Sequence, residues 1–257
     1  METIDVRRDG PVVTIELNRP EKKNAINATM WDELLATFRE IGASSVDRVV
    51  VITGKNNEFC SGADLSARGE GPPQHQLAAM RHVGDVALAL HRLPQPVIAK
   101  VRGVAVGAGC NLALGCDLVV ASTNARFSEI FARRGLSIDF GGSWVLPRRI
   151  GLHRAKELAF FADIIDAAEA ERICLVNRVV ADDDLDAFVD DWAQRLAAAA
   201  PIAVAMTKRM LNNSMQVTME EALDDEGLSQ TVNFGTDDTM EAMKAFMEKR
   251  SPTFEGR

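Results

Sequence analysis

The sequence lacks any apolar run that reaches the roughly 20 residues a membrane-spanning helix needs. Its beginning, METIDVRRDGPVVTIELNRP, also lacks the apolar stretch after positive charge and the small-residue cleavage site of a secretory signal. These absences predict a cytoplasmic protein with no membrane partner.

Positive charge is also scarce in this chain. The 257 residues include 29 lysines and arginines against 37 aspartates and glutamates, which gives a formal net charge of -8 at pH 7. A nucleic-acid-binding domain normally carries a net positive charge or a basic face. We therefore expect no nucleic-acid partner, and the 47% hydrophobic content indicates a soluble globular chain with a sizeable core.

Cysteine and histidine occur only 4 times each, and neither shows paired ligand spacing. Cys60, Cys110, Cys116 and Cys174 lie in apolar segments without a C-x-x-C pair, so we interpret them as small buried thiols. The acidic run DDDLDAFVDD lacks the glycine of a calcium loop and is typical of a solvated helix start. The sequence therefore predicts no metal.

Three common active-site motifs are missing. No G-x-S-x-G nucleophile elbow occurs in the sequence. Gly107-Ala108-Gly109 lacks the third glycine of a dinucleotide fingerprint, and Thr53-Gly54-Lys55 lacks the spacing of a phosphate loop. These absences argue against a serine hydrolase of that type and against nucleotide binding at these turns.

Strand and helix patterns alternate in the first part of the chain. Residues 12–17 alternate apolar and polar side chains, residues 49–53 form an almost wholly apolar strand, and Asn27 can cap the helix between them. A second β-α-β pattern covers residues 96–122. The alternation predicts an α/β fold whose sheet is buried on both faces.

After about Gly151 the strand signals nearly disappear, and apolar residues recur at helical spacing. This spacing predicts a helical C-terminal region. The expected helices cover residues 155–161, 185–199, 202–212, 219–231 and 237–249.

Two turns rich in glycine and alanine carry the strongest chemical signal. In VVVITGKNNEFCSGADL and VIAKVRGVAVGAGCNLALGCD, an apolar strand leads into such a turn and then into a helix. Small residues let the backbone approach a ligand closely, and free N–H groups at a helix start can hold developing negative charge. Together the two turns predict an oxyanion hole.

Taken in order, these segments resemble the enoyl-CoA hydratase/isomerase superfamily, whose members are also called crotonases. The resemblance covers nearly the whole chain and rests on RPEKKNAI, FCSGADL, GVAVGAGCNLALGCD, GLSIDFGGSWVLPRRIG and EKRSPTF. It implies a crotonase-like fold of repeated β-β-α units with a C-terminal helical trimerisation region. It also implies acyl-CoA thioesters as substrates.

The resemblance implies a domain organisation as well. Residues 1–195 would form the acyl-CoA-binding core, and residues 196–257 would form the helical oligomerisation region. We expect a homotrimer or a dimer of trimers, because the last helices carry apolar stripes that a monomer would leave exposed. No cofactor is expected, since coenzyme A is part of the substrate.

Carried over by position, the resemblance assigns roles to individual residues. The backbone N–H groups of Ala63 and Ala108 would bind the thioester oxygen, although many members have glycine at the second position. Substrate-binding roles would fall on Lys23, Ala25, Gly62, Asp64, Leu65, Gly107, Phe131, Phe140, Trp144, Phe246 and Lys249.

Several of these roles have a structural alternative. Phe131, Phe140 and Trp144 would wall the acyl pocket or simply pack in the core. Phe246 and Lys249 would reach coenzyme A from a neighbouring subunit or only pack on an amphipathic helix. The Asp64 side chain would bind the adenine amine or form local hydrogen bonds.

The sequence departs from the family's hydratases at both catalytic acids. Those enzymes use two glutamates to activate and deliver water. Here the matching positions hold Asn111, which cannot act as a base, and Phe131, which cannot transfer a proton. Asn111 would donate a hydrogen bond to the substrate or pack its helix. Glu129 lies two residues from the second position, and we interpret it as a surface acid or salt-bridge partner.

Asp139 stands where several isomerases of the family carry an aspartate, among apolar residues that raise the pKa of a carboxyl group. GAGCNLAL and GLSIDFGGSW look like the branch that acts on ring-opened phenylacetyl-CoA. Asp139 would then move a proton while the oxyanion hole stabilises a dienolate. Alternatively, it would only cap the following helix.

Other functions remain open at this point. A hydratase or hydrolase would use Asp139 or Glu129 to activate water, and a non-catalytic homologue would bind acyl-CoA without turnover. The favoured prediction is an enoyl-CoA isomerase whose catalytic residues are Asp139, Ala63, Ala108 and Asn111.

Overall fold

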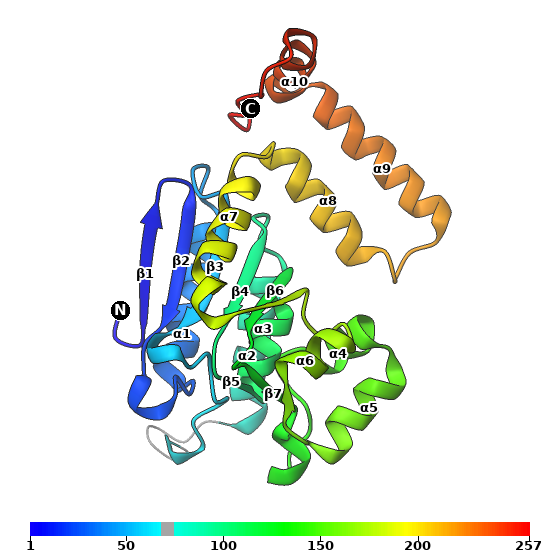
Figure 1. Cartoon of the computed structure of the whole chain (residues 1–257). Helices are drawn as coiled ribbons and strands as arrows, with labels where there is room; N and C mark the ends of the chain where they lie inside the picture. The colour runs from blue at the N-terminus through cyan, green and yellow to red at the C-terminus, as the bar shows by residue number, and fades with distance from the viewer. Residues whose placement is uncertain (68–74) are drawn as a thin grey trace.

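A computed structural model describes residues 1–67 and 75–257, and its centre is a six-stranded sheet (Figure 1). In spatial order the strands are β1 (Ile4–Asp9), β2 (Val12–Leu17), β3 (Val49–Gly54), β4 (Val97–Val101), β6 (Leu118–Ser122) and β9 (Arg178–Val180). β1 pairs with β2 antiparallel, whereas the other neighbours run parallel. The parallel part of the sheet confirms the predicted α/β fold class.

A second, three-stranded sheet contains β5 (Val104–Val106), β7 (Arg126–Ser128) and β8 (Ile165–Asp166). β5 and β7 pair in parallel, and β8 joins β7 antiparallel. Two 3-10 helices near the site are η3 (Leu65–Ala67) and η4 (Ile130–Arg134). The α-helices are α1 (Ala28–Gly42), α2 (Gln76–His91), α3 (Ala108–Gly115), α4 (Gly142–Ile150), α5 (Leu152–Phe161), α6 (Ala167–Arg172), α7 (Leu185–Ala197), α8 (Pro201–Asn213), α9 (Met219–Phe234) and α10 (Asp237–Glu248).

The helix predicted between the first two parallel strands is confirmed as α1. Asn27 is its N-cap, and the side-chain Oδ1 of Asn27 accepts a hydrogen bond from Met30 N at 2.9 Å. This bond satisfies one of the free N–H groups at the helix start. The helix buries Met30, Leu34, Phe38 and Ile41, which recur at helical spacing, against the sheet.

Apolar clusters cover both faces of the large sheet, as the sequence predicts. On one face, Ile15 and Ile52 belong to the same cluster as the buried side chains of α1 and α3. On the other face, α7 packs Leu185 and Val189 against a cluster that includes Ile98. The parallel strands are therefore removed from water on both sides, which is the usual setting for parallel sheets.

Five strands were not predicted from the sequence, namely β1, β5, β7, β8 and β9. β1 is an edge strand whose Arg7, Arg8 and Asp9 are exposed, so it shows little apolar alternation. β5, β7 and β9 contain only 3 residues each and β8 only 2, which are too few for a period of two to appear. The second part of the chain therefore contains more strand than predicted. The helices predicted there are confirmed as α5 and α7 to α10.

Three of the cysteines are buried thiols, as predicted. They are Cys60, Cys110 and Cys116, and burial raises the pKa of Cys60 to about 12. The prediction is wrong for Cys174, which is exposed. Cys174 lies in the turn after α6 at φ 63°, between the buried residues Ile173 and Leu175.

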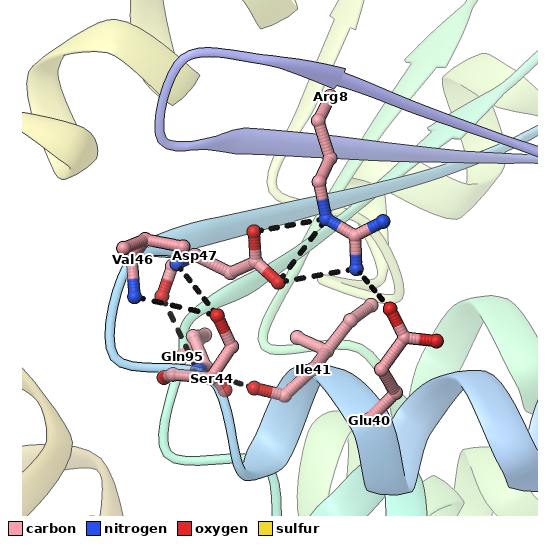
Figure 2. A network of polar contacts seen from close by, with 7 residues as sticks. All are labelled: Arg8, Glu40, Ile41, Ser44, Val46, Asp47 and Gln95. Carbon is pink, nitrogen blue, oxygen red and sulfur yellow. Dashed lines mark hydrogen bonds and ion pairs between the residues drawn. The ribbon is translucent and has the colours of Figure 1, made fainter.

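A buried polar network fixes the end of α1 against the sheet (Figure 2). Asp47 is 4% exposed and forms an ion pair with Arg8 of β1, with Oδ1 3.1 Å from Nε. Gln95 Nε2 donates to Ile41 O at 2.8 Å and to Asp47 O at 3.2 Å. Ser44 Oγ accepts from Asp47 N at 3.1 Å. Through these bonds, Asp47, Ser44 and the Gln95 amide nitrogen hold the connection from α1 to β3 in one conformation.

The helices α8, α9 and α10 extend beyond the sheet, and we call them the C-terminal arm (Figure 1). Lys208 of α8 joins the arm to the core through Asp117, with Nζ 2.6 Å from Oδ2. The predicted boundary after residue 195 falls in the last turn of α7, and the division stays a prediction. Large apolar side chains are exposed on α9 and α10, namely Met219, Leu223, Leu228, Val232, Phe234, Met240, Met243, Phe246 and Met247.

We predict that Gly109→Ala destabilises the protein, although alanine normally favours a helix. A Cβ atom at this position in α3 would lie 2.5 Å from Cys60 O and 2.7 Å from Cys60 Sγ. The backbone around Cys60 would have to shift, and overpacking of this kind costs on the order of 1–3 kcal/mol. Thermal unfolding measures the change.

Gly84→Ala is the matched control, because Gly84 also lies in a helix, α2, and its Cβ would meet no atom within 4 Å. This variant should gain roughly 0.5–1 kcal/mol of stability. If Gly109→Ala were as stable as Gly84→Ala, the close contact between α3 and Cys60 would be wrong.

Candidate active site

The two small-residue turns lie against each other. The first follows β3, and the second joins β5 to α3. Val106 N donates a hydrogen bond to Cys60 O at 3.0 Å. A Cβ atom on Gly62 would lie 2.8 Å from Val106 O and 3.8 Å from Ala108 N. The missing side chain of Gly62 therefore lets the backbones of the two turns touch, as the predicted oxyanion hole requires.

Ala63 and Ala108 each present a backbone N–H group. Within residues 1–67 and 75–257, neither group donates a hydrogen bond to another residue. Ala108 is the first residue of α3, where the helix carries a partial positive charge. Gly107 precedes it at φ 56° and ψ -125°, a conformation that glycine adopts readily. Both N–H groups are therefore free to hold a carbonyl oxygen that becomes negative.

The loop before α1 is joined to the first turn. Ile26 N donates to Gly62 O, and Asp64 N donates to Ile26 O, both at 2.8 Å. Asp64 Oδ2 also lies 2.9 Å from Arg19 Nη2. Hydrogen bonds from Ser66 and Arg19 lower the pKa of Asp64 to about 2. Asp64 thus forms local hydrogen bonds, one of the two roles considered for it, and it stays ionised at neutral pH.

Three further predicted binding residues border the first turn. Lys23 O accepts from Ser61 N at 3.0 Å, and Lys23 Nζ lies 2.8 Å from Glu58 Oε1. Ala25 is buried, and Leu65 is 45% exposed. The structure therefore brings Lys23, Ala25 and Leu65 to the Ala63 side of the site. Lys23 and Leu65 are open to solvent there.

Asp139 lies in the loop between η4 and α4. It is half-buried, and burial raises its pKa to about 6. Its Oδ1 atom is buried and has no hydrogen-bond partner among the described residues. A carboxyl group with a free oxygen and a pKa near neutrality is suited to take and return a proton.

The Asp139 side chain does not cap α4. The N-cap is Gly141, without a side-chain capping bond, and Asp139 contributes only its carbonyl oxygen, which accepts from Gly142 N at 2.9 Å. Phe140 and Gly141 have φ values of 49° and 79°, so the chain turns sharply before the helix begins. This turn separates the carboxyl group from the helix start. The capping alternative is therefore wrong.

Asn111 is a buried residue of α3 that reaches the Asp139 loop. Asn111 Nδ2 donates to Glu129 Oε2 at 3.3 Å and to Asp139 O at 3.0 Å. A Cβ atom on Gly142 would lie 2.4 Å from the Asn111 amide, so the start of α4 packs directly on this side chain. Both amide hydrogens are used inside the chain. Of the two roles considered for Asn111, these contacts support packing rather than donation to a substrate.

Glu129 is not the surface acid that the sequence indicated. It is 2% exposed, and burial raises its pKa to about 7, although hydrogen bonds from Cys110 and Asn111 oppose this shift. The segment runs from the end of β7 into η4, so the spacing of an α-helix gave the wrong direction for the Glu129 side chain. A usable signal was present, because Ile130 and Phe131 give Glu129 the same apolar setting that drew attention to Asp139.

The three predicted pocket walls do not form one group. Phe131 is buried beside the second turn, where a Cβ atom added to Gly107 would lie 3.7 Å from Phe131 Cζ. Phe140 stacks on Trp31 in the core, with ring centroids 5.2 Å apart. Trp144 lies on α4, and the guanidinium group of Arg148, one turn later in that helix, lies over its ring. Phe131 is therefore the member of this trio that borders the N–H donors.

A cavity of about 950 Å³ lies between α2, α4 and α8. Phe140 and Trp144 are among its lining residues, whereas Ala63, Ala108 and Asp139 are not. Phe140 and Trp144 thus line a separate space on the side of the C-terminal arm.

Phe246 and Lys249 lie at the end of the C-terminal arm. Phe246 is 85% exposed on α10, and Lys249 is the residue that ends this helix. Figure 1 shows α10 far from β5 and α3, which flank the second turn. One chain does not bring these two residues to the site. Their predicted contact with coenzyme A needs a neighbouring subunit.

The groups that the structure does bring together are two free N–H donors, one half-buried carboxyl group and a second, shielded carboxyl group. The described residues contain no group of three or more His, Cys, Asp or Glu side chains that could hold a metal ion. No helix in that part of the chain is long and apolar enough to cross a membrane. This set of groups can polarise a carbonyl and can move a proton beside it.

Comparison with known proteins places these groups in a family. The family described as enoyl-CoA hydratase/isomerase matches residues 7–257. The 1,2-epoxyphenylacetyl-CoA isomerase of Escherichia coli is 34% identical, over 100% of both chains. The short-chain-enoyl-CoA hydratase of Clostridium acetobutylicum is 36% identical, over 97% of this chain and 96% of that protein.

Solved structures show the same likeness. The structure of enoyl-CoA hydratase from Bacillus anthracis superimposes with a TM-score of 0.95 at 33% identity and covers 100% of both chains. An enoyl-CoA hydratase from Mycobacterium smegmatis gives a TM-score of 0.92 at 34% identity, with 99% of each chain covered. The likeness over the whole chain confirms the expected crotonase-like fold with C-terminal helices.

We predict that Glu129→Gln stabilises the protein above neutral pH. The pKa of Glu129 in the folded chain, about 7, lies above its ordinary value of 4.5, so folding takes up a proton between these pH values. The stability from this group is present below about pH 4.5 and is lost as the pH rises through about 7. Glutamine should therefore raise the unfolding free energy at about pH 8 by on the order of 1–3 kcal/mol.

Denaturant unfolding at about pH 8 and about pH 5 measures this effect, and the gain should nearly vanish at the lower pH. Glu157→Gln, which changes an exposed glutamate of α5, is the control and should show no such difference. A Glu129→Gln protein that is less stable than the unchanged chain at about pH 8 would contradict the assignment of a buried, destabilised carboxylate.

Proposed function

Because the chain belongs to the enoyl-CoA hydratase/isomerase family, we propose that it isomerises an enoyl-CoA thioester, with Asp139 as its acid–base group. The state of Asp139 carries the proposal. Asp139 is half-buried, its pKa is about 6, and its Oδ1 has no partner in the described chain. Asn111 and Phe131 stand where the family's hydratases have glutamates, so one proton carrier remains instead of two.

The proposed reaction begins when the N–H groups of Ala63 and Ala108 bind the thioester oxygen. The carboxylate of Asp139 takes a proton from a carbon alpha or gamma to the carbonyl. The electron pair of that C–H bond moves into the conjugated system and leaves negative charge on the thioester oxygen, where the two N–H groups stabilise it. Asp139 returns the proton at the other carbon, so the double bond shifts and no co-reactant is consumed.

A thioester related to phenylacetyl-CoA is the substrate we favour. The Escherichia coli relative is named for the isomerisation of 1,2-epoxyphenylacetyl-CoA, and it matches the full length of this chain. The segment GLSIDFGGSW, which carries Asp139, supported the same branch.

Hydration is the second candidate, because several relatives are named as hydratases and Glu129 offers another acid. A hydratase would need a second group that reaches water beside the substrate. Glu129 is 2% exposed and accepts a hydrogen bond from the Asn111 amide, which favours isomerisation. Hydrolysis and binding without turnover are further outcomes that product analysis distinguishes.

We also propose that the chain assembles as a homotrimer or a dimer of trimers through the C-terminal arm. The exposed apolar side chains of α9 and α10 support this, because a monomer would leave them in water. A neighbouring subunit would also bring Phe246 and Lys249 to the coenzyme A portion of the substrate.

We predict that Asp139→Asn lowers the isomerase rate by roughly 10²- to 10⁴-fold, the usual scale for loss of an acid–base group. Asparagine keeps the shape of the side chain but cannot accept the substrate proton, so acyl-CoA binding should change little. A panel of enoyl-CoA thioesters in deuterated water, analysed for double-bond position and deuterium, measures the rate.

Leu136→Ala is a suitable control, because it changes an exposed side chain of the same loop without removing an acid. Near-full turnover by Asp139→Asn would show that Asp139 is not the base. Water-derived oxygen in the product would favour hydration or hydrolysis, and binding without any product would favour a non-catalytic homologue.

We predict that Met240→Glu together with Met243→Glu breaks the assembly, because the two charges would have to be buried in the contact between arms. The unchanged chain should sediment as a trimer or a hexamer, and the double variant as a monomer. Val46→Glu is the control, since Val46 is 69% exposed but lies outside the C-terminal arm. A concentration-independent monomer for the unchanged chain at micromolar protein would rule the assembly out.

A further inference from the structure

Three residues that are joined by hydrogen bonds from Asn111 Nδ2 each carry an unpartnered polar atom. These atoms are Asn111 Oδ1 on α3, Glu129 Oε1 between β7 and η4, and Asp139 Oδ1 before α4. Each atom is buried and has no hydrogen-bond partner among the described residues. Buried polar atoms are paired in the great majority of cases, so a cluster of three unpaired ones calls for an explanation.

Asn111 connects the two acids of this cluster, Glu129 and Asp139. We call these two residues the acid pair. One side-chain nitrogen, Nδ2, lies 3.3 Å from Glu129 Oε2 and 3.0 Å from Asp139 O. The start of α4 presses on the same amide, because a Cβ on Gly142 would lie 2.4 Å from it. A change at Glu129 is therefore transmitted through Asn111 to the loop that carries the Asp139 carboxyl group.

The acid pair has no cation in the described part of the chain. The ionisable groups that act on Glu129 are the Cys110 thiol from α3 and the Asp139 carboxyl group from the loop before α4. Arg133, which lies on η4 four residues after Glu129, pairs instead with Asp163. Two carboxylates that are buried without a cation cannot both ionise at little cost, and such groups titrate as a pair.

We propose that Glu129 is a positioning residue that keeps its proton while Asp139 is ionised, and that it holds the Asp139 loop in place through Asn111. The inference rests on the proposed function, in which Asp139 is the base. Glu129 itself does not touch the substrate in this scheme. The working site then carries one negative charge on the acid pair and one exchangeable proton on Glu129.

A dependence on pH follows from this arrangement. Below about pH 6 both acids are protonated, so Asp139 has no carboxylate to accept the substrate proton. Between about 6 and 7, Asp139 is ionised and Glu129 is neutral. Above about 7, the second negative charge opposes the build-up of charge on the substrate oxygen, so kcat/KM should fall by on the order of tenfold.

The first test measures the proton on Glu129 without using turnover. Infrared difference spectra of the apoprotein, with ¹³C-labelled glutamate, report the C=O stretch of a protonated glutamic acid. We expect this band at about pH 6.5, its loss above about pH 7, and its absence in Glu129→Gln. In Asp139→Asn the band should vanish at a lower pH, because the neighbouring negative charge is gone.

The second test compares pH–rate profiles. The unchanged chain should show an acid limb near pH 6 and a fall above about pH 7, whereas Glu129→Gln should keep the first and lose the second. Glutamine still offers an oxygen to Asn111. Glu129→Met offers none, so it should lower kcat with little change in KM, and glutamine at this position should rescue kcat.

The outcomes separate this inference from the proposed function. A missing glutamic acid band at about pH 6.5, or a band that Asp139→Asn leaves unmoved, overturns the inference even if the enzyme isomerises enoyl-CoA. An alkaline fall that persists in Glu129→Gln overturns it as well. If the band moves as expected but no thioester is turned over, the proposed function fails and the coupling of the acid pair stands.

Discussion

The contact between the backbones of the two small-residue turns is the constraint on which the site depends. Cβ atoms on Gly62 and Gly109 would lie 2.8 Å and 2.5 Å from backbone oxygens of the opposite turn. A side chain at either position would push the turns apart, and the N–H groups of Ala63 and Ala108 would separate with them. Because α3 begins at Ala108, the same contact also fixes the place of Asn111, and hence of the loop that carries the proposed base.

Features that rest on local evidence could be predicted from the sequence. Val12–Leu17 shows its alternation within six residues, and Asn27 marks the start of α1 because its side chain bonds a backbone N–H three positions on. The two turns are visible because the small residues that permit their contact are themselves the signal. The strands β8 and β9 were missed because they form only through pairing with β7 and β6. Segments of two or three residues show no sequence pattern that would indicate a partner far away in the chain.

The candidate site could be predicted only in part, for the same physical reason. Asp139 stood out because an acid among apolar residues is costly wherever it lies. Glu129 had the same setting, but its direction depends on how β7 runs into η4 and on Asn111, which comes 18 residues earlier in the chain. Trp144 was expected to wall the acyl pocket or to pack in the core. The turn before α4 points its ring toward the cavity under α8 instead.

Among the described residues, fixed dipoles rather than cations meet the negative charge in this site. The start of α3 at Ala108 is positive at every pH, because a backbone N–H does not titrate. A cation beside the proposed base would lower the pKa of its carboxyl group, as Asp64 of the same chain demonstrates. Ser66 and Arg19 bind Asp64 and hold its pKa at about 2, whereas Asp139, which only burial affects, has a pKa of about 6. The Asp64 carboxylate therefore stays ionised and holds a loop. The Asp139 carboxyl group can still exchange a proton, as catalysis requires.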